Sequence, residues 1–175
     1  MVKGYHKNNV EDYKRACAFH QFVARGIRAY AYPILFLLAA VALLIIGIVA
    51  ENAALNIGAA ILFALSVALP FITLAMQNTK IDKKVRESRD YLKTEQFFTF
   101  EKESLRLTIQ AGSRVESYDI PFAQIPRVYA RKDRYYIYIG ASQILILKRQ
   151  NIREGSAEEL NELFRSLGKR FREKR

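Results

Sequence analysis

The sequence has few of the residues that build disulfides, metal sites and nucleotide sites. Among its 175 residues are one cysteine, Cys17, and two histidines, His6 and His20. A single cysteine excludes an intramolecular disulfide and suits a reducing cytoplasm. The histidines are too far apart for a one-turn metal pair, so we expect no metal site. Neither G-x-G-x-x-G nor G-x-x-x-x-G-K-[ST] occurs, and we expect no cofactor.

Charge is absent from two long runs. Residues 29–50 and 57–76 contain no Asp, Glu, Lys, Arg or His. At about 1.5 Å per helical residue, each run spans roughly the 30 Å of a bilayer's hydrocarbon core. We therefore predict two transmembrane helices joined by an external connector at residues 51–56. A buried helical pair in a soluble protein is the alternative. The lack of ionisable groups inside the runs argues against a transporter or pump.

Positive charge flanks both outer ends of this hairpin, whereas the connector contains one acid, Glu51, and no base. Because cytoplasmic flanks carry the excess of Lys and Arg, we predict that both termini are cytoplasmic. The flanking bases are Lys3, Lys7, Lys14, Arg15, Arg25 and Arg28 before the first run and Lys80, Lys83, Lys84, Arg86, Arg89 and Lys93 after the second.

The segments beside the two runs have helical patterns. Residues 1–28 are predicted to be a cytoplasmic amphipathic N-terminal arm, with Asn9 as a helix N-cap and Glu11 and Asp12 in the first turn. We interpret this arm as interfacial, and a partner-binding helix is the alternative. Residues 77–95 keep a weak apolar stripe and are predicted to form a charged helical stalk.

Residues 96–175 change to an alternation with period two, which is typical of strands. Six segments are rich in aromatic and β-branched residues: FFTFEK, LRLTIQ, VESYDI, IPRVYAR, RYYIYIG and QILILKR. They predict a small antiparallel β-sandwich or barrel. Ser156 and Glu159 then form a capping-box pattern before a helix that closes the sheet core. The apolar stripe of this helix is Leu160, Leu163, Phe164, Leu167 and Phe171. The expected fold class is an α+β membrane protein.

Several of these segments together resemble a known family. VEDYKRA before the hairpin, then IPFAQIPRVYARKDRYYIYIG and ILILKRQNI before SAEELNELFRSL, are similar to the YcxB-like family of bacterial membrane proteins. The resemblance covers nearly the whole chain. It implies a bacterial inner-membrane location and a cytoplasmic C-terminal domain of pleckstrin-homology-like (PH-like) fold, with strands capped by one helix. The molecular function of that family is not established. Leu147 departs from the family pattern, which commonly has a proline there.

Basic residues gather in two places in this domain. The first group surrounds one hairpin and comprises Arg127, Arg131, Lys132 and Arg134; the second follows the last strand and comprises Lys148, Arg149 and Arg153. A solvated strand face is the favoured interpretation of both groups. The second group is our candidate for contact with an anionic surface, because a tethered domain is held near a charged leaflet. Nucleic acid is disfavoured, because alternating tyrosines are more often strand core.

No arrangement of residues in the sequence indicates catalysis. We predict a membrane-anchored cytoplasmic binding or interaction module, with the lipid bilayer and, through its domain, a protein as partners. A membrane-bound enzyme whose site no motif reveals is the alternative. An anionic-lipid or nucleic-acid binder is the third hypothesis. The ligand, the partner and the oligomeric state stay open.

Overall fold

A computed structural model describes residues 1–87, 91–140 and 143–173. Parts of the expected stalk and C-terminal domain, at residues 88–90, 141–142 and 174–175, lie outside the described residues. The chain divides into two compact units. One comprises Met1–Ala16 with Val85–Arg175, and the other comprises Cys17–Lys84. We call them the β-unit and the helical unit.

The helical unit contains two long apolar helices. Helix α1 (Val10–Phe19) leads through a π-helical turn η1 (His20–Ala24) and a 3-10 turn η2 (Gly26–Tyr30) to α2 (Ala31–Val49), which is followed by α3 (Ala53–Glu87). Helices α2 and α3 are long and apolar enough to cross a membrane. Only 11% of the most apolar 18-residue stretch of each helix is buried within the structure, so most of this apolar surface is exposed. Of the stalk expected at residues 77–95, α3 covers the part as far as Glu87, whereas Thr94 and Glu95 belong to strand β2 (Thr94–Phe100).

The connector is shorter than residues 51–56, the range expected from the sequence. Only residues 50–52 separate α2 from α3. The Asn52 side chain accepts a hydrogen bond from the Ala54 amide at 3.0 Å, and the Asn52 amide donates to the Gly47 carbonyl at 2.9 Å. A Cβ at Gly47 would collide with Asn56, so this glycine permits the tight return. Asn52 therefore caps α3, and the helix begins at Ala53, before the start of the apolar run at residue 57.

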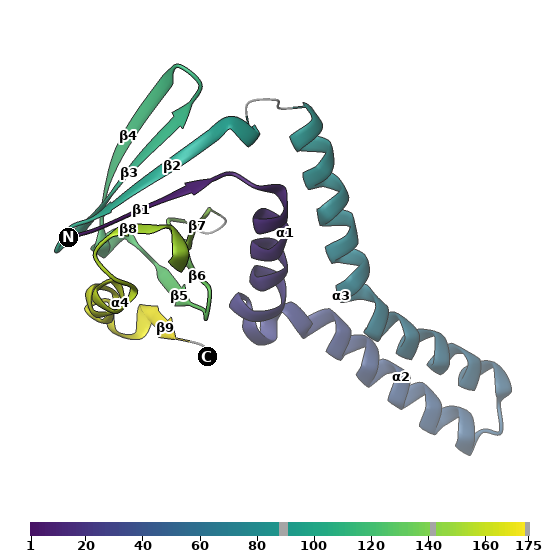
Figure 1. The fold of residues 1–175 in the computed structure, drawn as a ribbon. Coiled ribbons are helices and arrows are strands. Elements are labelled where there is room, and N and C mark those ends of the chain that lie inside the picture. The colour runs from purple at the N-terminus through teal and green to yellow at the C-terminus, as the bar shows by residue number, and fades with distance from the viewer. Residues whose placement is uncertain (88–90, 141–142, 174–175) are drawn as a thin grey trace. The chain divides into compact units, whose positions relative to one another are not determined.

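The β-unit contains two sheets (Figure 1). The first has the order β4-β3-β2-β1-β8 and the second has the order β7-β6-β5-β9. All pairs are antiparallel except β5 with β9. All six strands expected from the alternation are present. The strands are β1 (Val2–Lys7), β2 (Thr94–Phe100), β3 (Ser104–Ala111), β4 (Arg114–Pro121), β5 (Arg127–Ala130), β6 (Arg134–Tyr138), β7 (Ile144–Lys148), β8 (Ile152–Glu154) and β9 (Phe171–Glu173).

Strand β1 corrects the expected division of the chain into an arm at 1–28 and a domain at 96–175. It lies between β2 and β8 in the first sheet, with Val2 opposite Phe100 and Lys7 opposite Glu95. Val2 is fully buried. A Cβ at Gly4 would lie 2.8 Å from Leu147 Cδ1 of β7, so glycine allows the two sheets to approach. The arm lacked a strong strand signal because its hydrogen-bonding partners lie far along the chain.

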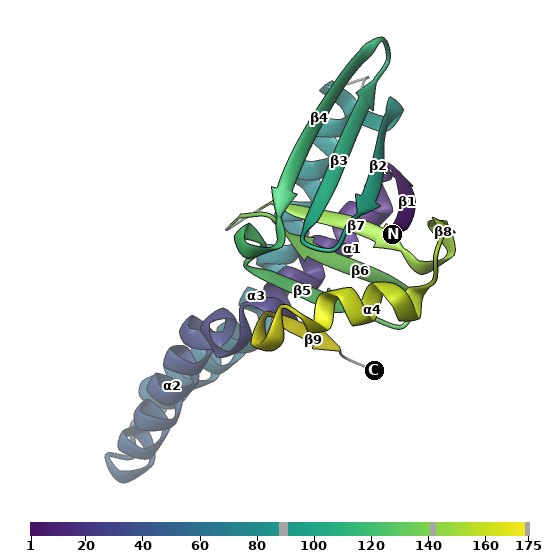
Figure 2. The same cartoon turned by 90° about the vertical axis from the view of Figure 1, so that its left-hand side faces the viewer.

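The core lies between the sheets and is closed by α4 (Ala157–Arg165). Figure 2 shows α4 lying along the second sheet. Its predicted cap is confirmed, since Ser156 Oγ accepts from the Glu159 amide at 3.1 Å. Phe164 is fully buried, with its ring against those of Phe100, Phe122, Tyr135 and Phe171. The helix ends at Arg165, so Leu167 of the predicted stripe lies beyond it and Phe171 belongs to β9.

Candidate functional site

A buried polar cluster joins the N-terminal segment to the second sheet of the β-unit. Its members are His6 of β1, Asp12 of α1, Arg134 of β6 and Lys148 of β7. Arg134 and Lys148 face each other in the β6–β7 register. Asn9 starts α1 by accepting a hydrogen bond from the Glu11 amide at 2.8 Å, which fixes Asp12 in the first helical turn.

Asp12 is the centre of the cluster. Its Oδ1 accepts from Arg134 Nη1 at 2.9 Å, and its Oδ2 lies 2.7 Å from Lys148 Nζ. Arg134 also donates to Asp133 Oδ2, at 2.8 Å from Nε and 2.7 Å from Nη2. Two carboxylates therefore offset two cations. The cluster has no formal excess charge when His6 is neutral.

The environment fixes the protonation of Asp12 and His6. Burial would raise the pKa of Asp12, but hydrogen bonds from Lys148 and Arg134 outweigh it and hold this pKa below its ordinary value. Burial lowers the pKa of His6; Asp12 opposes this effect, while Lys148 and Arg134 add to it. At neutral pH the cluster therefore holds an ionised aspartate beside an uncharged imidazole.

The lowered pKa of His6 gives the β-unit a stability that depends on pH. Unfolding restores an ordinary imidazole, with a pKa near 6.5, which binds protons more readily than the folded one. We therefore expect the free energy of unfolding to be highest above about pH 6.5 and to decline as the pH falls below it. Chemical unfolding of the detergent-solubilised protein between pH 8 and pH 5, followed by circular dichroism, measures this slope.

The matched controls for this slope are His6→Gln and His20→Gln. The first should flatten the decline between about pH 6.5 and pH 5, and the second should keep it. Asp12 adds a separate loss only below its ordinary value near 3.8, because its folded pKa is lower still. An unchanged slope in His6→Gln would show that the imidazole is not the group responsible.

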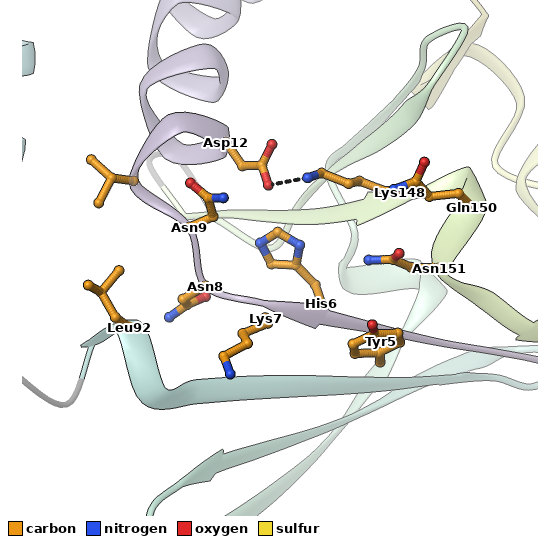
Figure 3. A pocket seen from close by; sticks show the side chains of 11 residues that line it. Tyr5, His6, Lys7, Asn8, Asn9, Asp12, Leu92, Lys148, Gln150 and Asn151 are labelled. Carbon is orange, nitrogen blue, oxygen red and sulfur yellow. Dashed lines mark ion pairs between the residues drawn. The ribbon is translucent and has the colours of Figure 1, made fainter.

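A cavity of about 450 Å³ adjoins the cluster. Figure 3 shows Asn8, Asn9, His6 and Asn151 around the space beside the Asp12–Lys148 ion pair. Nine of its eleven lining residues have polar side chains, and its volume lies within the range of small-molecule sites. The lining residues are Tyr5, His6, Lys7, Asn8, Asn9, Val10, Asp12, Leu92, Lys148, Gln150 and Asn151. The cavity therefore suits a ligand held by hydrogen bonds.

The three residues expected to contact an anionic surface have separate intramolecular partners. Lys148 pairs with Asp12. Arg149 Nε donates to the Arg131 carbonyl at 3.0 Å, and its guanidinium lies 5.0 Å from the centroid of the Tyr135 ring. The guanidinium of Arg153 lies 4.1 Å from the centroid of the Tyr5 ring. The structure thus brings Lys148 into the cavity and leaves Arg149 and Arg153 stacked on tyrosines.

Sequence reasoning missed His6 and Asp12 as site residues. Asp12 looked like a helix-dipole residue, and His6 looked isolated from any second ligand. Asp12 and Arg134 are 122 positions apart, so no local spacing connects them. The burial of residues 2–7 alternates and places His6 on the same side as Val2 and Gly4, but the residue types of VKGYHK do not show this alternation.

The arrangement suits binding better than proton transfer. Asp12 is held as a carboxylate, and the Arg134 and Lys148 cations are tied to it. Within residues 1–87, 91–140 and 143–173, no three His, Cys, Asp or Glu side chains are placed to hold a metal ion.

Comparisons of the chain with family models, with curated proteins and with solved structures gave no match. The cluster and the cavity therefore have to be interpreted from their own chemistry.

Proposed function

We propose that this protein is a membrane-anchored binding module whose β-unit lies on the cytoplasmic side of a bacterial inner membrane. One observation carries the proposal: the two long apolar helices are inserted between β1 and β2, which are paired neighbours in one sheet. The chain leaves this sheet after Lys7 and rejoins it at Glu95, the residue opposite Lys7. A segment inserted in this way crosses a bilayer an even number of times.

The apolar surface of the helices supports insertion. Side chains such as Leu35, Leu38, Ile57 and Phe71 are more than half exposed along α2 and α3. Exposed apolar surface on this scale is unfavourable in water and favourable in lipid, and α-helices satisfy their own backbone hydrogen bonds there. Two crossings place both termini on one side. The Lys and Arg residues flanking the helices support the cytoplasm as that side.

The architecture of the β-unit supports the resemblance to the YcxB-like family. Two sheets closed by one helix agree with the PH-like fold that this resemblance implies. We propose the cavity beside His6 and Asp12 as its binding site, because that is where hydrogen-bonding groups converge on a space of ligand size. A protein bound through the β-unit is a further partner within this proposal.

Cysteine accessibility tests the membrane topology. In a Cys17→Ser background, we expect Asn52→Cys to react with a membrane-impermeant maleimide added outside intact cells. Cysteines in place of Lys3 and Arg172 should react only after the inner membrane is opened. The chain should also stay with the membrane in alkaline carbonate.

Two results would contradict this proposal. Extraction by carbonate would mean that the helices are not inserted, and external labelling at residue 3 or 172 would reverse the orientation. To separate binding from catalysis, the purified protein is incubated with any ligand it retains. If the wild-type protein converted that ligand, the protein would be a membrane-bound enzyme and not a binding module.

A further inference from the structure

The cavity beside the buried cluster presents hydrogen-bond donors from two amide side chains. Asn8 Oδ1 already accepts from Gln96 Nε2 at 3.2 Å, and Asn9 Oδ1 already accepts from the Glu11 amide. Each asparagine thus already uses its side-chain oxygen as an acceptor within the protein, and its NH₂ group has two protons to donate. A ligand in this cavity meets donors at the positions of Asn8 and Asn9.

His6 is a mostly buried polar residue whose side chain lines this space. The residue contributes to the wall of the cavity, and only 4% of its surface is exposed. Within the part of the chain that the structure describes, its ring makes no hydrogen bond. The ring nitrogens are therefore free to hydrogen-bond to a ligand that enters the cavity.

The start of α1 adds to the donor character of the cavity. Asn9 and Val10 line it, and α1 is ten residues long. The first amides of a helix lack intrahelical acceptors, and the helix dipole favours negative charge there. Lys148 supplies an ammonium group beside the first turn of α1, 2.7 Å from Asp12 Oδ2. Asp12, which also lines the cavity, does not repel an anion strongly, because Arg134 and Lys148 both lie against its carboxylate.

We propose that this cavity binds a compact oxyanion, the carboxylate or phosphate group of a small molecule or of a lipid headgroup, through His6, Asn8, Asn9 and Lys148. This inference rests on the proposed binding function and names the chemistry of its ligand. It also explains why a neutral imidazole is placed beside so many donors. A bound oxyanion supplies the negative charge that allows His6 to take up a proton from solvent.

The proton linkage follows from the charges that face His6. Asp12 from α1 favours the imidazolium, while Lys148 from β7 and Arg134 from β6 oppose it. Gln96, opposite His6 on β2, carries no charge. An oxyanion in the cavity would raise the pKa of His6, and by reciprocity the oxyanion would bind more weakly as the pH rises. The affinity should fall about tenfold per pH unit between the pKa values of His6 in the free and bound protein.

The test uses the full-length protein in detergent micelles with ¹⁵N-labelled histidine. The chain has two histidines, so His20→Gln assigns the signals. Sodium sulfate is the first probe, because its charge is constant from pH 5.5 to pH 8, and sodium chloride at equal ionic strength is the control. We expect sulfate, but not chloride, to shift the His6 signals and to raise the pKa of His6. Sodium acetate should act in the same way.

Asn9→Asp and Asn9→Ser form a matched pair. Both keep an N-cap oxygen, so α1 should remain capped. The aspartate replaces the donor by a carboxylate and should abolish the response to sulfate, whereas the serine keeps a hydroxyl donor and should retain a weaker response. Equal unfolding transitions of the two variants would show that the difference lies in the ligand and not in the fold.

Two further arms identify the source of the oxyanion. The protein is placed in nanodiscs of phosphatidylcholine alone, or with phosphatidylglycerol, without added sulfate. A shift of the His6 signals only with phosphatidylglycerol identifies a lipid headgroup, and a shift only with a soluble anion identifies a small molecule. No response of His6 to sulfate, acetate or phosphatidylglycerol would overturn the inference. The membrane topology would still stand in that case, since cysteine labelling tests it independently.

Discussion

Val2→Asp is expected to unfold the β-unit while leaving the helical unit helical. Val2 is fully buried in the core, where it packs with residues of both sheets. A carboxylate at this position would lose its water without gaining a partner, which costs at least about 4 kcal/mol, a large share of the stability of a small domain. Loss of the strand signal in circular dichroism and rapid proteolysis between residues 96 and 173 should report the change.

Lys3→Gln is the matched control for Val2→Asp. Lys3 lies next to Val2 on the same strand, but its side chain is 40% exposed and pairs with Glu154 at the surface. Loss of this exposed pair should change the free energy of unfolding by less than about 1 kcal/mol. If Val2→Asp unfolded no more readily than Lys3→Gln, β1 would not be part of the folded β-unit.

Because β1 is an interior strand of the first sheet, a fragment of the β-unit should fold only if it contains β1. Residues 96–173 alone should not unfold cooperatively, because β2 and β8 both lose their neighbour β1. A chain in which Asn-Gly replaces residues 9–93 keeps β1 beside β2 and should unfold more cooperatively than residues 96–173 alone, although it lacks Asp12 and should be less stable than the intact β-unit. Asn8 and Thr94 are already joined by a 3.0 Å backbone hydrogen bond, and Asn-Gly favours a two-residue hairpin. A fully stable 96–173 fragment would contradict the structure.

Asp12→Asn is expected to destabilise the β-unit by about 3 kcal/mol. Removing one partner of a buried ion pair leaves the other charge uncompensated, which typically costs about 3–5 kcal/mol. We expect the lower end because Arg134 keeps Asp133 and because the Lys148 side chain is 26% exposed and reaches water. Urea unfolding at pH 7.5 measures the difference.

Asp133→Asn is the control for Asp12→Asn, because Asp133 also pairs with Arg134 but is exposed to solvent. Asp133 lies as close to Arg134 as Asp12 does, but 61% of its side chain is exposed. Because solvent screens such a pair, its loss should cost less than about 1 kcal/mol. Equal effects of Asp12→Asn and Asp133→Asn would show that the cluster contributes through surface electrostatics alone.

The features that sequence predicted well are those with a local physical cause. The two charge-free runs became α2 and α3, since a long apolar helix needs no distant partner to satisfy its backbone. The six alternating segments became strands, and Asn9 and Ser156 cap the helices they precede. Each signal lies within a few residues of the structure it specifies.

The features that only the tertiary structure decided depend on residues far apart in the chain. Strand β1 (VKGYHK) carries little apolar area, and it becomes an interior strand only because β2 and β8 flank it. His6, Asp12, Arg134 and Lys148 come from four separate elements, so their charges and the adjoining cavity have no signature in the sequence. The sequence by itself determined two apolar helices and a capped β-domain. Long-range strand pairing decided that the helices interrupt this domain and that a buried ion pair lies beside its cavity.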